Sequence, residues 1–171
     1  MIKKFTGMLS KIAIILVVFY FAAFLFVSQA RAIEYPLPNP GILPDSPVYF
    51  LKVARDQTIL WFIKDPLQKA FYLLFLSDKR LAAGGISVVK AEDYFKQAVD
   101  QGVIAKKSGK DTTDLFSKFV VSSAKHEEII NSLLTKTSGK ESEQLLKAHR
   151  DNLNSKERVR EIFFQAVGFS K

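Results

Sequence analysis

The two histidines of the chain are the residues whose types and spacing come closest to a chemical site. His126 and His149 lie at nearly equal distances from the Ser-Gly turn at residues 138–139. If the flanking helices form an antiparallel hairpin, both imidazoles reach the same level, and Glu127 could add an oxygen ligand for zinc or copper. Two histidines and one carboxylate are too few for a structural zinc centre. We therefore predict no bound metal and keep these three residues as weak candidates.

No other part of the chain has the residues of a catalytic centre. There is no cysteine and no Gly-x-Ser-x-Gly motif to supply a nucleophile. Gly84-Gly85 follows a predicted helix instead of preceding one, so it is typical of a helix stop and not of a phosphate-binding loop. Carboxylate pairs such as Glu92-Asp93 are more typical of solvated helix faces than of acid–base couples. The sequence predicts that the protein is not an enzyme and uses no cofactor.

The N-terminus has the pattern of an export signal. Residues 1–11 contain three lysines and no acidic residue, and residues 12–27 are uninterruptedly apolar. Ala30 and Ala32 then occupy positions −3 and −1 of a signal-peptidase site, where small side chains are required. We predict a signal peptide at residues 1–32, cleaved after Ala32.

The alternative is an uncleaved membrane anchor formed by residues 12–27, because this stretch is long for a signal and short for a comfortable span. In that case the lysines stay cytoplasmic and the rest of the chain lies outside. Both fates predict a periplasmic or extracellular location for residue 33 onward. The lack of cysteine excludes a disulfide scaffold and a lipoprotein.

Charge narrows the choice of partners. Residues 1–32 contain four basic residues and no acidic one, so their removal lowers the net charge from +8 to +4. This modest excess suits anionic headgroups or wall polymers, and nucleic acid is excluded by an extracytoplasmic location. The predicted partners are the membrane surface, a second copy of the chain or another envelope protein.

The elements that must position all these residues are helices, and the predicted fold class is all-α. Proline density over residues 33–46 precludes helix and predicts an extended strap or linker. Ser46-Pro47 and Asp65-Pro66 each combine a capping oxygen with a proline at the first helical position. Apolar periodicity and turn residues predict a bundle domain, residues 47–171, of about five helices at 47–63, 66–83, 87–107, 111–135 and 141–167. The last two should form a long antiparallel hairpin, with a weak stretch at residues 152–155.

A family resemblance supports this architecture. The run Leu-Pro-Asp-Ser-Pro-Val-Tyr-Phe-Leu-Lys at residues 43–52 is followed by Asp65-Pro66 and by Lys-Arg-Leu-Ala at residues 79–82. This pattern resembles a family of exported bacterial helical domains of unknown function, which begin with a Leu-Pro-Asp-Ser-Pro-x-Tyr-x-Leu-Lys signature behind a signal sequence. The resemblance is specific over about residues 41–83. It implies an all-α exported domain and supplies no activity.

The strongest functional signal is an excess of apolar residues in the first two predicted helices. The second helix is apolar on every side over residues 70–76, which no single core-facing stripe can accommodate. Either this helix is central and covered by the others, or part of it meets a partner. We predict an interaction surface at Trp61, Phe62, Tyr72, Leu73 and Leu76.

The sequence as a whole predicts an exported, non-catalytic helical module of the cell envelope that acts through apolar and mildly basic surfaces. The alternative is an extracytoplasmic metal-binding or metal-responsive domain that uses His126 and His149.

Overall fold

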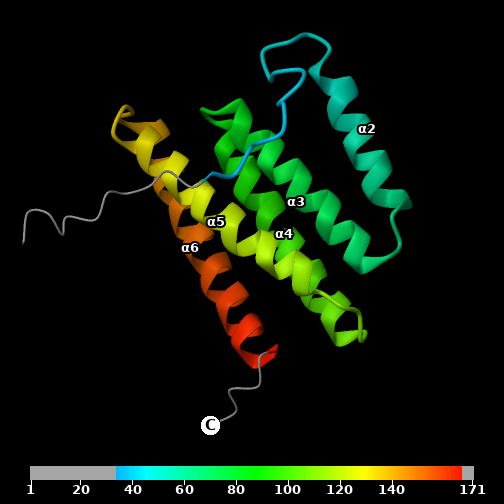
Figure 1. The fold of residues 1–171 in the computed structure, drawn as a ribbon. Helices are drawn as coiled ribbons and strands as arrows, with labels where there is room; N and C mark the ends of the chain where they lie inside the picture. The colour runs from blue at the N-terminus through cyan, green and yellow to red at the C-terminus, as the bar shows by residue number, and fades with distance from the viewer. Residues whose placement is uncertain (1–33, 167–171) are drawn as a thin grey trace, which may run out of the picture. The chain divides into compact units, whose positions relative to one another are not determined.

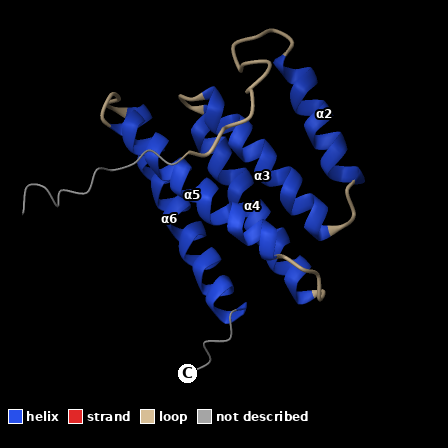
Figure 2. Ribbon diagram, in the orientation of Figure 1, coloured by secondary structure: helices blue, strands red, loops and turns tan. Residues whose placement is uncertain are grey.

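The computed structural model describes residues 34–166, with side chains to residue 162. Over this range the chain forms five helices and no strand, which confirms the predicted all-α class (Figures 1 and 2). The helices are α2 (Tyr49–Phe62), α3 (Pro66–Ala83), α4 (Ser87–Lys107), α5 (Thr113–Leu134) and α6 (Lys140–Ala166). The predicted signal segment, with Ala30 and Ala32, lies outside the described residues. No helix in the described range is both long enough and apolar enough to cross a bilayer.

The helices pack as a bundle with α2 at one edge. Helix α3 has its largest interface with α4 and also contacts α5 and α2. Helices α5 and α6 lie side by side and run antiparallel, as a long hairpin (Figure 1). Helix α6 is continuous through residues 152–155, so the weak stretch predicted there is absent. The reason is that Asn152 and Ser155 are buried in the bundle, and the Asn152 amide donates to Glu92 of α4.

One of the two predicted helix caps is present. The Asp65 side chain accepts a hydrogen bond from the Gln68 N–H at 2.9 Å, and Pro66 occupies the first helical position. The cap predicted at Ser46 is wrong. Its backbone takes part in two successive i to i+3 turns, donating to Leu43 and accepting from Tyr49, and these turns delay the helix until Tyr49.

The core corrects part of the predicted interaction surface. Leu73 is 2% exposed and Leu76 is 1% exposed, and both lie in the larger apolar cluster that joins α3 to α4 and α5. Tyr72 packs against the same cluster and is half-buried. Other elements cover most of the apolar stretch of α3, although Phe75 is 43% exposed, so Leu73 and Leu76 are core residues and not contact residues.

The other two predicted surface residues, Trp61 and Phe62, lie at the end of α2. Their side chains are 68% and 66% exposed, and their rings touch edge to face with centroids 4.9 Å apart. The structure therefore leaves them free to contact a partner.

The strap, residues 34–46, runs without helix along the bundle. Leu37 packs against the smaller apolar cluster, which contains residues of α3, α4, α5 and α6. Farther along, the Lys52 ammonium donates to the carbonyls of Pro40 and Ile42, at 2.5 and 2.9 Å. These contacts attach the strap both to the core and to α2.

The difference between Asp65, which caps a helix, and Ser46, which does not, can be tested directly. We expect Asp65→Ala to lower the urea midpoint of unfolding, because it removes the acceptor for the Gln68 N–H and a partner of Lys110 at 2.6 Å. Ser46→Ala is the matched control and should leave the midpoint unchanged. Equal shifts for the two variants would contradict the helix starts described here.

A second test separates core from surface leucines. Leu76→Ala should lower the free energy of unfolding by about 2–5 kcal/mol, because it leaves a cavity in a packed core. Leu51→Ala on α2 should change it by no more than about 0.5 kcal/mol, because that side chain is 55% exposed. Urea denaturation followed by circular dichroism measures both, and a small effect at Leu76 would refute its place in the core.

Candidate functional site

Four helices bring polar side chains to one place inside the bundle. Asp78 comes from α3, Glu92 from α4, His126 from α5 and Asn152 from α6, and each is less than 5% exposed. Ser122, one turn before His126 on α5, is also buried. Burying two carboxylates in a small domain is unfavourable unless they are paired and hydrogen-bonded.

The histidine ring bridges the two carboxylates. His126 Nδ1 lies 2.6 Å from Glu92 Oε1, and Nε2 lies 3.3 Å from Asp78 Oδ1. An ionised carboxylate only accepts hydrogen bonds, so both ring nitrogens must donate, which only the protonated imidazolium can do. The site is therefore one buried cation held between two buried anions.

Uncharged side chains donate further hydrogen bonds to the two carboxylates. The Ser122 hydroxyl donates to Asp78 Oδ1 at 2.8 Å, and the Tyr35 hydroxyl of the strap donates to Asp78 Oδ2 at 2.6 Å. The Asn152 amide donates to Glu92 Oε2 at 3.3 Å. Each of the four carboxylate oxygens thus has a donor, and only Asn152 Oδ1 is left without a partner. The charged network is satisfied by groups from all five elements that surround it.

The titration behaviour follows from this geometry. Burial lowers the pKa of His126, but its hydrogen bonds to Asp78 and Glu92 and their negative charges outweigh burial and raise the pKa to about 9. Burial also raises the pKa of the Tyr35 phenol, and the bond to Asp78 raises it further, so the hydroxyl stays a donor. The Phe95 ring, fully buried, lies 5.2 Å from the His126 ring and keeps water away from it.

The structure does not arrange the three weak metal-ligand candidates, His126, His149 and Glu127, as a metal site. His126 has a carboxylate at each nitrogen, and Glu127 instead pairs with Lys156 at 2.5 Å. The Nε2 atom of His149 is buried without a hydrogen-bond partner. Within residues 34–166 no three His, Cys, Asp or Glu side chains are arranged to hold a metal ion.

Sequence reasoning missed most of this cluster. The interpretation of Glu92-Asp93 as a solvated pair is right for Asp93, which is exposed, and wrong for Glu92, which is 1% exposed. The position of Glu92 in the sequence indicates its burial. It lies four residues after Val88 and three before Phe95, on the apolar stripe of its helix. A charge on such a stripe predicts a buried partner.

A second charged group joins α2 to α3. Asp56 of α2 is fully buried, accepts from the Arg55 guanidinium at 2.7 Å and lies 3.6 Å from that of Arg80. Arg80 also donates to the Tyr49 hydroxyl. The side of α2 that faces the bundle is thus held largely by charges.

The opposite side of α2 is apolar. Its outer face, defined here as Phe50, Leu51, Trp61 and Phe62, is more than half exposed at every position. Lys64 lies just beyond the helix, with its ammonium 5.2 Å from the centre of the Trp61 ring.

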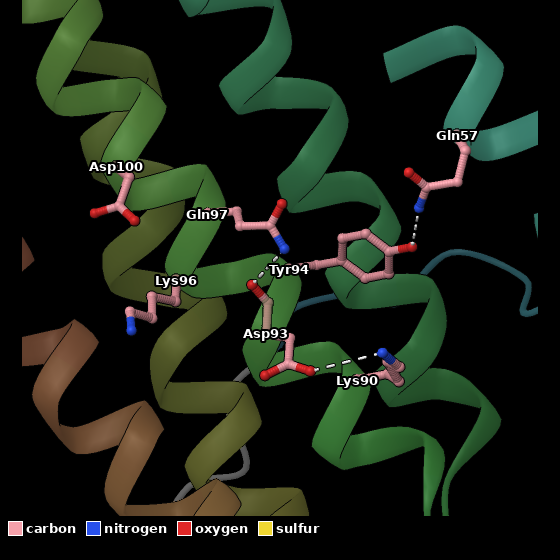
Figure 3. A pocket seen from close by; sticks show the side chains of 7 residues that line it. All are labelled: Gln57, Lys90, Asp93, Tyr94, Lys96, Gln97 and Asp100. Atoms are coloured by element: carbon pink, nitrogen blue, oxygen red, sulfur yellow. Dashed lines mark hydrogen bonds and ion pairs between the residues drawn. The ribbon is translucent and has the colours of Figure 1, made fainter. Parts of the chain in front are cut away.

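A surface cleft of about 530 Å³ lies between α2 and α4 (Figure 3). Its lining is polar, and the Gln57 amide spans it to the Tyr94 hydroxyl at 3.2 Å. Lys90 and Asp93 pair with each other at 3.9 Å on the same wall. The lining contains no histidine and no nucleophile next to a base, so the cleft has no catalytic arrangement.

The buried imidazolium gives a pH prediction. Its folded pKa lies above the ordinary value, so its stabilisation is complete below about pH 6.5 and is lost as the pH rises to about 9. We expect the free energy of unfolding to fall by up to about 3 kcal/mol over this range. Urea midpoints measured across it should follow this decline.

The second histidine supplies the control. His149→Gln should keep the decline, whereas His126→Gln should lose it, since only His126 sits between carboxylates. If His126→Gln does not fold, the ring signals of the two histidines in NMR give the same answer. A His126 that titrates near pH 6.5 would contradict the imidazolium assignment.

Comparison with known proteins identified no relative of this chain. A scan against protein-family models, a search of curated proteins and a search of solved structures each found no match.

Proposed function

We propose that this chain is an exported, non-catalytic helical module of the cell envelope, and that it acts through the outer face of α2. The observation that carries this proposal is the inverted polarity of that helix. Its buried residues are Lys52, Asp56 and Leu60, two of them charged, while the side chains of Phe50, Trp61 and Phe62 are exposed.

An amphipathic helix on a water-soluble domain normally has the reverse arrangement. Burying a large apolar side chain contributes roughly 1.5–3 kcal/mol. A partner that covered the four exposed side chains of the outer face would gain this contribution at each of them. Single exposed apolar residues are ordinary, but four large ones on the same side of one helix indicate an interaction surface.

Several contacts hold α2 in this orientation. Lys52 donates to two strap carbonyls, Asp56 pairs with Arg80, and Leu60 enters the larger apolar cluster. Turning the outer face inward would expose Leu60 and leave both charges without their partners. The inversion is therefore a stable property of the domain.

The rest of the chain supports a role without chemistry. The imidazolium of His126 has no free nitrogen, because Glu92 and Asp78 each bind one of them. The basic and apolar segments at residues 1–27 support export. The proline-rich strap then begins the exported part and is bonded to the bundle at both ends.

The absence of cysteine permits a clean labelling test. Single variants Leu51→Cys and Phe62→Cys report on the outer face, and Ile104→Cys and Leu146→Cys are matched controls on α4 and α6. The wild-type side chains are 55% and 66% exposed on α2 and 47% and 49% exposed at the controls. An isolated domain would therefore label at the α2 positions at least as readily as at the controls.

In intact cells, a membrane-impermeant maleimide should label the control cysteines, because the domain lies outside the cytoplasm. The two α2 cysteines should label several-fold more slowly, because a partner covers them. Equal labelling at all four positions would refute the contact surface, and no labelling at the controls before cell lysis would refute export.

A further inference from the structure

The geometry points to a bilayer that contains anionic lipids as the surface on which the outer face of α2 docks. This inference rests on the proposed function and names its partner. Two observations carry it: the charge around the face and the polar groups within it. The position of the apolar segment in the chain adds to them in the uncleaved form.

The charges that α2 presents to solvent are positive. Its one acidic residue, Asp56, is fully buried, whereas the Arg55 side chain is 58% exposed. Lys64 follows directly and is exposed beside the Trp61 ring. Anionic headgroups attract basic residues at a membrane surface, and a tryptophan next to a lysine is typical of the depth where headgroups meet acyl chains.

The outer face carries no unsatisfied polar group that lipid would have to desolvate. Between its two aromatic ends lie Ala54 and Thr58, both exposed. The Thr58 hydroxyl donates to the Ala54 carbonyl at 2.8 Å, inside the helix. Large apolar side chains therefore lie at both ends of the outer face, with a small side chain and a satisfied hydroxyl between them, which suits a helix that lies in the plane of the interface.

A second copy of the chain fits this face less well. In a symmetric dimer with the two α2 helices antiparallel, Arg55, near the middle of the helix, would approach its own counterpart, and Lys64 would approach the start of the partner's helix. Arg55 is paired with Asp56 of its own helix, whereas the outer face has no exposed acidic residue that could pair with Lys64. Lipid phosphates supply the missing negative charge.

The short connection between the apolar stretch, residues 12–27, and the described domain keeps the domain close to a membrane. In the uncleaved form, residues 28–33 separate the apolar stretch from the described domain, and six residues span at most about 20 Å. Such a short connection gives the bilayer a high effective concentration near the domain.

Trp61 is the one tryptophan of the chain and reports on its own surroundings. The full-length protein is reconstituted into vesicles of phosphatidylcholine alone or of an equal mixture with phosphatidylglycerol. In the mixed vesicles we expect the Trp61 emission to shift to shorter wavelength and to be quenched by brominated acyl chains. Both effects should weaken in phosphatidylcholine alone and in high salt.

A matched control variant places the single tryptophan at another exposed position. In Trp61→Phe with Leu146→Trp, the tryptophan occupies an exposed position on α6 and should stay unshifted and unquenched. Lys64→Gln should reduce the quenching of Trp61, whereas Lys140→Gln, an exposed lysine at the start of α6, should not.

Three results would overturn the inference. One is a Trp61 that stays unshifted and unquenched in the mixed vesicles. Another is equal quenching at position 146. The third is a shift without lipid quenching that grows with protein density, which would identify a second copy as the partner. Protection of the α2 cysteines in cells, combined with an unquenched Trp61 in vesicles, would leave the proposed function standing with a protein as its partner.

Discussion

The rest of the structure depends on the imidazolium of His126 between the carboxylates of Asp78 and Glu92. Removing ions from water is costly, and the cost is offset only when every acceptor finds a donor. The donors here come from α5, α6 and the strap, so no two helices can satisfy the group alone. A helix that slid by one residue would leave a charge unpaired, and the cluster thereby fixes how α3, α4, α5 and α6 align.

Helix α3 carries charged residues on two of its sides. Asp78 belongs to the cluster shared with α4 and α5, whereas Arg80 meets Asp56 and Tyr49 of α2. Because α2 is held by these polar contacts and by Leu60, the side chains of Phe50, Trp61 and Phe62 are not used for packing. The apolar outer face of α2 is thus a consequence of how the helix is attached.

Local signals predicted the helices well. Asp65-Pro66 starts α3 and Gly84 ends it, as expected from capping oxygen, fixed proline geometry and a glycine at positive φ. The start of α2 was misplaced because the Ser46 backbone forms turns with its neighbours. Leu73 and Leu76 were assigned to a surface because an all-round apolar helix looks the same in sequence whether neighbours or a partner cover it.

The sequence by itself determined the class, the helices and the turns, because these depend on residues a few positions apart. It also identified Trp61 and Phe62 as candidates for contact. Only the tertiary structure decided that Glu92 is buried and Asp93 is not, and that His126 pairs with carboxylates instead of a metal. The partners of these charges lie 34 to 60 residues away, and whether a charge can be buried depends on donors that only folding brings to it.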